Sequence, residues 1–125
     1  MPDGTVTVLV VDDQAPFRAA ARLVVRATNG FDVVGEARSG EEALEAVSSL
    51  GPELVLMDIN MEGIGGIEAS RRIRDGHPGT RVILLSTYDE DDLPADARTC
   101  GAIAYIHKER FGPDILEGAW RDAAQ

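Results

Sequence analysis

Five polar side chains stand where short apolar runs of the sequence end, namely Asp12, Asp13, Asp58, Ser86 and Lys108. Carboxylates that are held close together repel one another, and a small hard cation such as Mg²⁺ relieves this repulsion while needing only one or two of them as ligands. A carboxylate at the end of a buried strand can also act as a nucleophile. The set therefore favours phosphoryl chemistry on Asp58, with Mg²⁺ and Lys108 neutralising charge and Ser86 donating a hydrogen bond.

Each of these residues has an ordinary structural explanation when it is considered alone. Adjacent aspartates often cap a helix, as Asp13 could do here. A serine at a strand end usually starts a turn, and a lone lysine is usually a solvated surface charge. The joint placement favours chemistry, because four separate apolar runs deliver three carboxylates, a hydroxyl and an ammonium to their carboxyl ends.

The apolar runs themselves are rich in Val, Ile and Leu, which is typical of strands buried on both faces. They alternate with helical patterns, so the sequence predicts an α/β domain with a doubly wound parallel sheet. Ligands of such sheets bind beyond the carboxyl ends of the strands, where the five polar residues fall. The predicted strands cover 5–11, 32–37, 54–58, 82–86 and 104–106.

Two helices are expected before the third strand. The first carries an apolar stripe from Phe17 to Val25 at helical spacing and is ended by Asn29-Gly30. The second opens with the capping box Ser39-Gly40-Glu41-Glu42 and stops at Gly51-Pro52.

Three more helices are expected in the second half of the chain. The third covers about 66–75, and the fourth covers about 91–100 although Pro94 falls inside it. The fifth begins at Pro113, because proline suits the first turn of a helix.

Length and composition suit one domain over residues 1–125. Apolar residues make up 44% of the chain and charged residues 27%, as in globular proteins. The formal net charge of −10 argues against direct binding of DNA or RNA, which needs a basic face. Cys100 is the only cysteine, no secretory signal is visible, and the apolar runs are far too short for a membrane span. We therefore expect a cytoplasmic protein with no membrane partner.

Four segments of the sequence resemble the response-regulator receiver domains of two-component signalling: Val8–Asp13, Leu56–Met61, Leu84–Thr87 and Gly101–Lys108. The spacings of 28 residues from Asp58 to Ser86 and 22 from Ser86 to Lys108 are also familiar in that family. The resemblance covers essentially the whole chain. It implies a flavodoxin-like (βα)5 fold with a five-stranded parallel sheet in the strand order 2-1-3-4-5. Two further segments look similar to receivers of the subfamily that often carries a helix-turn-helix output domain, Phe31–Ala37 and Thr87–Asp89.

The resemblance also implies roles for the residues at the strand ends. Asp58 would be the phosphoacceptor, and Lys108 would pair with the phosphoryl oxygens. Mg²⁺ would be bound by Asp13, by Asp58 and by the backbone carbonyl of Asn60, and more remotely by Asp12 through water.

Four residues are implied to control the switch and its lifetime. Ser86 would be the switch hydroxyl and Tyr105 the rotating aromatic residue, and Asn60 and Tyr88 hold the positions that tune dephosphorylation. We expect Ser86 to move toward the phosphoryl group and Tyr105 then to turn inward, which reshapes the face of the fourth helix, fifth strand and fifth helix.

The partners implied by the resemblance lie outside this chain. The phosphoryl donor would be a phosphohistidine of a histidine kinase or a phosphotransfer protein, and a homodimer could form on phosphorylation. A DNA-binding output domain could follow in a longer parent protein. The chain would promote only its own phosphorylation and dephosphorylation, so it would not be a conventional enzyme.

The sequence departs from the family pattern at four places. Glu62 stands where proline is usual, Gly65 replaces a frequent aspartate, and Glu109 follows Lys108 where proline is common. Pro94 makes the fourth helix unusual. These departures leave open a pseudo-receiver that binds partners without phosphorylation.

Two other rival functions are less favoured. A phosphate-ester hydrolase generally needs a second acid–base carboxylate shortly after its nucleophile, and Asn60 cannot serve. A flavodoxin-like cofactor binder would bring a phosphate against strand-end loops that are acidic here.

Overall fold

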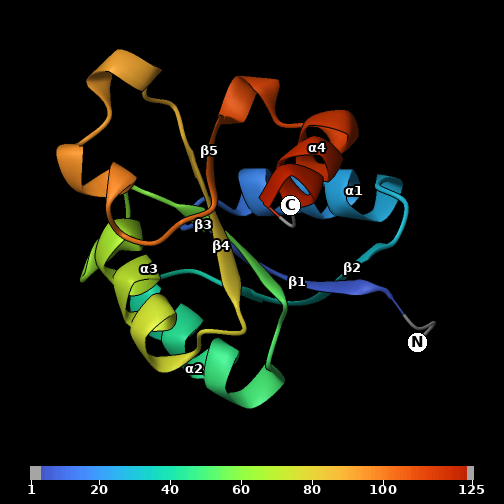
Figure 1. Cartoon of the computed structure of the whole chain (residues 1–125), viewed down its shortest axis with the longest axis horizontal. Helices are drawn as coiled ribbons and strands as arrows, with labels where there is room; N and C mark the ends of the chain where they lie inside the picture. Colours follow the sequence, from blue (N-terminus) through green and yellow to red (C-terminus); the bar gives the residue numbers. More distant parts are fainter. Residues whose placement is uncertain (1–3, 124–125) are drawn as a thin grey trace.

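The structure is a computed structural model, and it describes residues 4–123 of the chain. A parallel sheet forms the middle layer of the fold (Figure 1). Helices α1 (Ala15–Ala27) and α4 (Pro113–Ala123) cover one face, and α2 (Gly40–Leu50) and α3 (Gly65–Gly76) cover the other. An apolar cluster fills the space on each side of the sheet, so the strands are buried from both faces.

The five strands are arranged in the order β2-β1-β3-β4-β5, which confirms the topology that the family resemblance implies. All neighbouring strands pair in parallel, with Val11 of the first strand opposite Met57 of the third. Each predicted range agrees with the observed strand to within one residue at either end. The strands are β1 (Val6–Val11), β2 (Phe31–Ala37), β3 (Leu54–Asp58), β4 (Arg81–Ser86) and β5 (Ala104–His107).

Four of the five predicted helices form, and local signals fix their ends. The Oγ atom of Ser39 accepts a 3.1 Å hydrogen bond from the backbone N–H of Glu42, which caps α2 as predicted. Gly51 ends that helix in the left-handed region with a φ of 57°. Pro113 opens α4. None of the helices between residues 4 and 123 is long and apolar enough to cross a membrane.

The predicted fourth helix is wrong, because two short 3-10 turns replace it: η1 (Glu90–Asp92) and η2 (Ala95–Arg98). Pro94 lies between them with a ψ of 141°, an extended conformation. A proline ring disfavours a helical residue before it and removes one backbone N–H, so the helix cannot continue. In Figure 1 this segment, drawn in orange, loops away from β5. Residues of the segment and of β5 line a groove of about 780 Å³.

Candidate functional site

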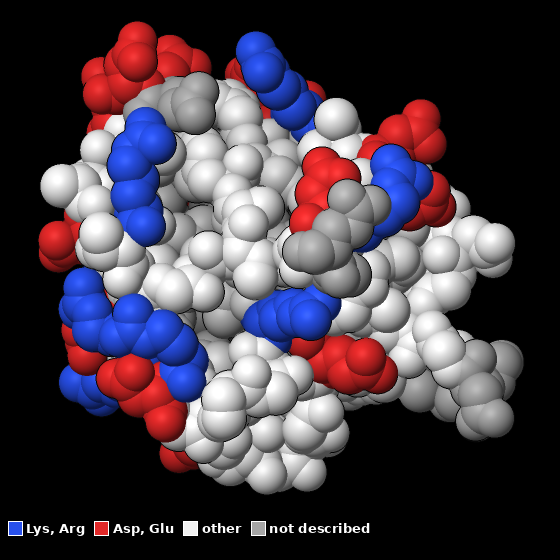
Figure 2. Space-filling view, in the orientation of Figure 1, with Lys and Arg blue, Asp and Glu red and all other residues white. Residues whose placement is uncertain are grey.

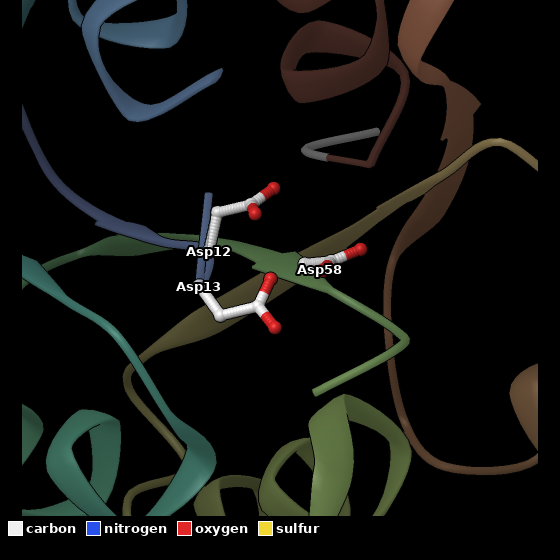
Figure 3. Close-up of side chains that lie close together, drawn as sticks. All are labelled: Asp12, Asp13 and Asp58. Atoms are coloured by element: carbon white, nitrogen blue, oxygen red, sulfur yellow. The ribbon is translucent and has the colours of Figure 1, made fainter. Parts of the chain in front are cut away.

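The carboxylates of Asp12, Asp13 and Asp58 meet at the carboxyl ends of β1 and β3 (Figure 3). One oxygen atom from each carboxylate can be chosen so that all three lie within 4.8 Å of one another. Val11 of β1 lies opposite Met57 of β3, and the next residues along the chain are Asp12 and Asp58. The pairing of the two strands therefore brings these two carboxylates together. Asp12 is only 1% exposed and Asp58 only 5%, whereas Asp13 is exposed. The sequence therefore correctly predicts that these three side chains lie together.

Lys108 joins the three aspartates from η3 (Lys108–Arg110), the 3-10 turn that follows β5. Its Nζ atom donates a 2.6 Å hydrogen bond to Oδ2 of Asp12 and lies 3.4 Å from Oδ1 of Asp58. The same atom lies 4.4 Å from the centroid of the Phe17 ring on α1, which is a cation–π contact. Phe17 is a neighbour of the site that sequence analysis read only as part of an apolar stripe.

The pKa of the Asp58 carboxyl is raised from 3.8 to about 6, first by burial and second by the negative charge of Asp12. Lys108 and the backbone N–H of Asn60 oppose this shift. The pKa shows that one ammonium does not fully compensate two buried carboxylates. A second cation beside Asp58 would favour its ionised form.

The donor set fits Mg²⁺, because it offers carboxylate oxygens, the ligands that this ion prefers. Both oxygens of Asp12 are already engaged: Oδ1 accepts a 2.8 Å hydrogen bond from the backbone N–H of Gln14, and Oδ2 accepts from Lys108. Gln14 is the N-cap of α1, and its backbone N–H is the group that binds Asp12. Asp13 does not cap this helix. Asp13 and Asp58 are held more loosely, because Oδ1 of Asp13 accepts a 3.5 Å bond from the Gln14 side chain and Oδ1 of Asp58 lies 3.4 Å from Lys108.

Gly66 sets the position of Asp58 from the start of α3. Its backbone N–H donates a 3.0 Å hydrogen bond to the carbonyl of Ile59, and a Cβ atom at Gly66 would lie 1.9 Å from the carbonyl oxygen of Asp58. Gly65 has a φ of 75°, a conformation that glycine adopts without strain. This role of Gly66 was not predicted, and the sequence signal for it is the three glycines within residues 63–66.

Ser86, Tyr88 and Tyr105 form a second network beside the aspartates. The Tyr105 hydroxyl donates to the backbone carbonyl of Tyr88, so the Ser86 hydroxyl must donate in its 3.0 Å contact with Tyr105. The Ser86 oxygen accepts a 2.8 Å bond from the backbone N–H of Tyr88. The Tyr88 hydroxyl in turn lies 3.4 Å from Oδ1 of Asn60, two residues beyond Asp58.

The hydroxyls of Ser86 and Tyr105 are in direct contact in this structure. The inward turn of Tyr105 after Ser86 moves stays a prediction. Movement of Ser86 toward Asp58 would therefore break an existing hydrogen bond with Tyr105.

A family model described as the response regulator receiver domain matches residues 8–119. This chain belongs to the response-regulator receiver family. As a receiver domain of two-component signal transduction, it is not a classical enzyme. The acidic pocket of Asp12, Asp13 and Asp58 with Lys108 is consistent with a switch that depends on phosphorylation.

The receiver is similar to two groups of curated response regulators. It is 40% identical over 103 residues to the response regulator GacA of Pseudomonas viridiflava and 39% identical over 111 residues to the response regulator UvrY of Escherichia coli K12. The matches cover 82% and 89% of this chain but only 48% and 51% of those relatives. The chain thus spans about half the length of the curated relatives it matches.

Solved structures have the same fold over nearly the whole receiver. The response regulator domain of Thermotoga maritima CheB is 31% identical with a TM-score of 0.85, and the match covers 97% of this chain and 98% of that one. A two-component response regulator of the LuxR family from Aurantimonas sp. SI85-9A1 is 28% identical with a TM-score of 0.85, and the match covers 96% of this chain and 86% of that one.

Proposed function

We propose that this receiver is a signalling switch whose Asp58 accepts a phosphoryl group from a phosphohistidine of a histidine kinase or a phosphotransfer protein. The observation that carries the proposal is the joint position of three carboxylates within 4.8 Å of one another and one ammonium bound to two of them. Phosphoryl transfer depends mostly on positioning and charge neutralisation, and this arrangement provides both.

The transfer converts the Asp58 carboxylate into an acyl phosphate. A carboxylate oxygen attacks the phosphorus atom, the P–N bond of the phosphohistidine breaks, and its electron pair stays on the ring nitrogen, so that the donor leaves as neutral histidine. Lys108, which lies 3.4 Å from Asp58, would then pair with a phosphoryl oxygen. Water later attacks the phosphorus, the bond between phosphorus and the Asp58 oxygen breaks, and inorganic phosphate leaves as the carboxylate is restored.

Asp13, Asp58 and the backbone carbonyl of Asn60 would hold Mg²⁺, and Asp12 would support it through water. The bound ion would supply positive charge to the phosphoryl oxygens. The two hydrogen bonds that already occupy Asp12 support its indirect role. The exposure of Asp13 supports access for the ion.

Ser86 would carry the signal from Asp58 to the surface. Its hydroxyl would leave Tyr105 and donate to a phosphoryl oxygen, which frees the Tyr105 hydroxyl and biases the position of that ring on β5. Tyr88 and Asn60, joined by a 3.4 Å hydrogen bond, would set the access of water and hence the lifetime of the acyl phosphate.

The output of the switch would come from a longer protein that contains this receiver. The relatives are about twice as long, and one solved structure of the same fold is described as a DNA-binding response regulator of the LuxR family from Staphylococcus aureus. We propose a DNA-binding output domain beyond this chain, a cytoplasmic location with no membrane partner, and a homodimer on phosphorylation. The receiver itself would not bind nucleic acid, because acidic and basic side chains are interspersed on the visible face (Figure 2) and the net charge is −10.

Intact mass after incubation with acetyl phosphate tests the switch chemistry. We expect one added phosphoryl group in the presence of Mg²⁺, none with a chelator, and none in the Asp58→Asn variant. Asp91→Asn, which removes an exposed carboxylate from η1, should still take up the group. An adduct on Asp58→Asn contradicts the proposal. If the wild-type protein shows no adduct and binds neither beryllofluoride nor Mg²⁺, the pseudo-receiver function replaces it.

A further inference from the structure

The imidazole of His107, the last residue of β5, uses both of its ring nitrogens. Nε2 lies 3.0 Å from the backbone carbonyl of Thr87, and Nδ1 lies 3.1 Å from the backbone nitrogen of Glu109. A backbone N–H can only donate, so Nδ1 must accept and carries no proton. The neutral ring therefore has its proton on Nε2, which donates to Thr87. This assignment comes from the hydrogen-bond partners alone.

These two hydrogen bonds connect the two segments that hold reactive side chains. Thr87 directly follows Ser86, and Glu109 directly follows Lys108. Ser86 is also the register partner of His107 in the pairing of β4 with β5. The bond to Glu109 caps η3, the turn that presents Lys108 to the aspartates. His107 is thus the side chain that links the position of the Ser86 segment to that of the lysine.

Protonation of His107 would break one of the two links. The imidazolium carries a proton on both nitrogens, so Nδ1 could no longer accept from Glu109, whereas Nε2 could still donate to Thr87. Histidine is the residue type that changes charge between about pH 5 and 8. Acidification would therefore release the cap of η3 and leave Lys108 less firmly placed.

The charges around the ring are mixed. Oδ1 of Asp89, in the loop after β4, lies 3.8 Å from Nε2. The residues that follow the ring in η3 are Lys108, Glu109 and Arg110, and Arg98 of η2 lines the same groove as His107.

We propose that His107 is a positioning residue, which couples the Ser86 segment to Lys108 while its imidazole is neutral and uncouples them when it is protonated. The proposal rests on the proposed function, since it assigns a control to the same phosphorylation site. The imidazole touches neither the aspartates nor the transferred group, and it acts through the two backbone segments.

Two variants separate the two links. Asn places an oxygen near the position of Nδ1, so His107→Asn keeps the cap on Glu109 and loses the bond to Thr87. Gln reaches the position of Nε2, so His107→Gln keeps the bond to Thr87 and loses the cap. Neither side chain titrates. The readout is the initial rate of Asp58 phosphorylation by acetyl phosphate with Mg²⁺, measured from pH 5.5 to 8.

We expect both variants to be about fivefold slower than the wild-type protein at pH 8, the effect of one lost hydrogen bond. The ratio of the wild-type rate to each variant rate should fall toward one at pH 5.5, because protonation breaks the coupling in the wild-type protein itself. A role limited to capping η3 predicts that His107→Asn matches the wild-type protein at every pH. That result, or a ratio that does not change with pH, overturns the proposal.

A second measurement does not depend on phosphorylation, so it separates this proposal from the proposed function. Nitrogen NMR of the unphosphorylated protein should show the Nε2–H tautomer of His107. The amide signals of Thr87 and Glu109 should move with one common titration midpoint, and this movement should be absent in both variants. An Nδ1–H tautomer, or separate midpoints for the two amides, contradicts the coupling whether or not Asp58 accepts a phosphoryl group.

Discussion

The ammonium of Lys108 donates its shortest hydrogen bond, 2.6 Å, to Asp12 and not to Asp58. The distance from Nζ to Asp58 is 3.4 Å, so the proposed nucleophile is the less well compensated of the two buried carboxylates. This asymmetry agrees with the raised pKa of Asp58, about 6. It leaves Asp58 able to interact with a cation or a phosphoryl group, while Asp12 fixes the lysine.

The raised pKa of Asp58 predicts that Asp58→Asn stabilises the metal-free protein at neutral pH. The folded-state pKa of about 6 lies above the unfolded value of 3.8, so the folded state binds more protons between these values. The contribution of Asp58 to stability is therefore fully present below about pH 4 and is lost as the pH rises through 6. We expect Asp58→Asn to gain about 3 kcal/mol in the free energy of urea unfolding at pH 7.5.

The gain should shrink as the pH falls toward 4, because Asp58 is then neutral in both states of the wild-type protein. Asp91→Asn, at an exposed position, should show no such pH-dependent gain. An Asp58→Asn protein that is less stable than the wild-type protein at pH 7.5 and equal to it at pH 4 would reverse the predicted sign.

Mg²⁺ should raise the melting temperature of the wild-type protein. An ion that binds only the folded state stabilises it by about 2.7 kcal/mol at a concentration one hundred times its Kd. Asp13→Asn should remove most of this effect, since Asp13 offers its oxygens to the proposed ion. Differential scanning fluorimetry with a Mg²⁺ titration measures the shift. An unchanged response in Asp13→Asn would exclude that residue as a ligand.

The face of the Phe17 ring should help to hold the Lys108 ammonium in place. Phe17→Leu keeps an apolar side chain but removes the ring, so we expect a loss of about 1 kcal/mol in the free energy of unfolding and slower phosphorylation by acetyl phosphate. Phe17→Trp retains an aromatic face and is the matched control. Equal phosphorylation rates in Phe17→Leu and Phe17→Trp would show that packing, and not the cation–π contact, is what Phe17 provides.

Gly66 and Gly76 provide a matched pair within α3. Gly66→Ala should lower the free energy of unfolding by about 2 kcal/mol, because its Cβ atom would lie 1.9 Å from the carbonyl oxygen of Asp58 and the backbone must shift. Gly76→Ala should be neutral or slightly stabilising, since no atom lies within 4 Å of the position of its Cβ. Urea unfolding of both variants measures the difference. Equal effects at the two positions would contradict the close approach at Gly66.

The sheet and the aspartate cluster could be predicted because they depend on signals that lie close together in the sequence. The apolar strands are bounded by polar residues, and parallel strands bring their carboxyl ends to one edge. Once the strand order was implied, the meeting of Asp12 and Asp58 followed from the register of β1 with β3.

The segment of the predicted fourth helix shows where such signals fail. Its charged residues were compatible with a helix, but Pro94 separates two 3-10 turns instead. Some tertiary contacts could not be predicted either. No pattern in the sequence indicates that the Phe17 ring lies against Lys108 or that His107 makes two hydrogen bonds.

Identification of the modified residue shows whether Asp58 is the phosphoacceptor. The protein would be phosphorylated with acetyl phosphate and Mg²⁺, reduced with borohydride, digested, and sequenced by mass spectrometry. Reduction converts an aspartyl phosphate into homoserine, so the account predicts homoserine at position 58, with Asp12 and Asp13 unchanged. Homoserine at either of those positions, or a phosphoryl group that resists reduction because it is on a hydroxyl, would contradict the assignment of Asp58 as the phosphoacceptor.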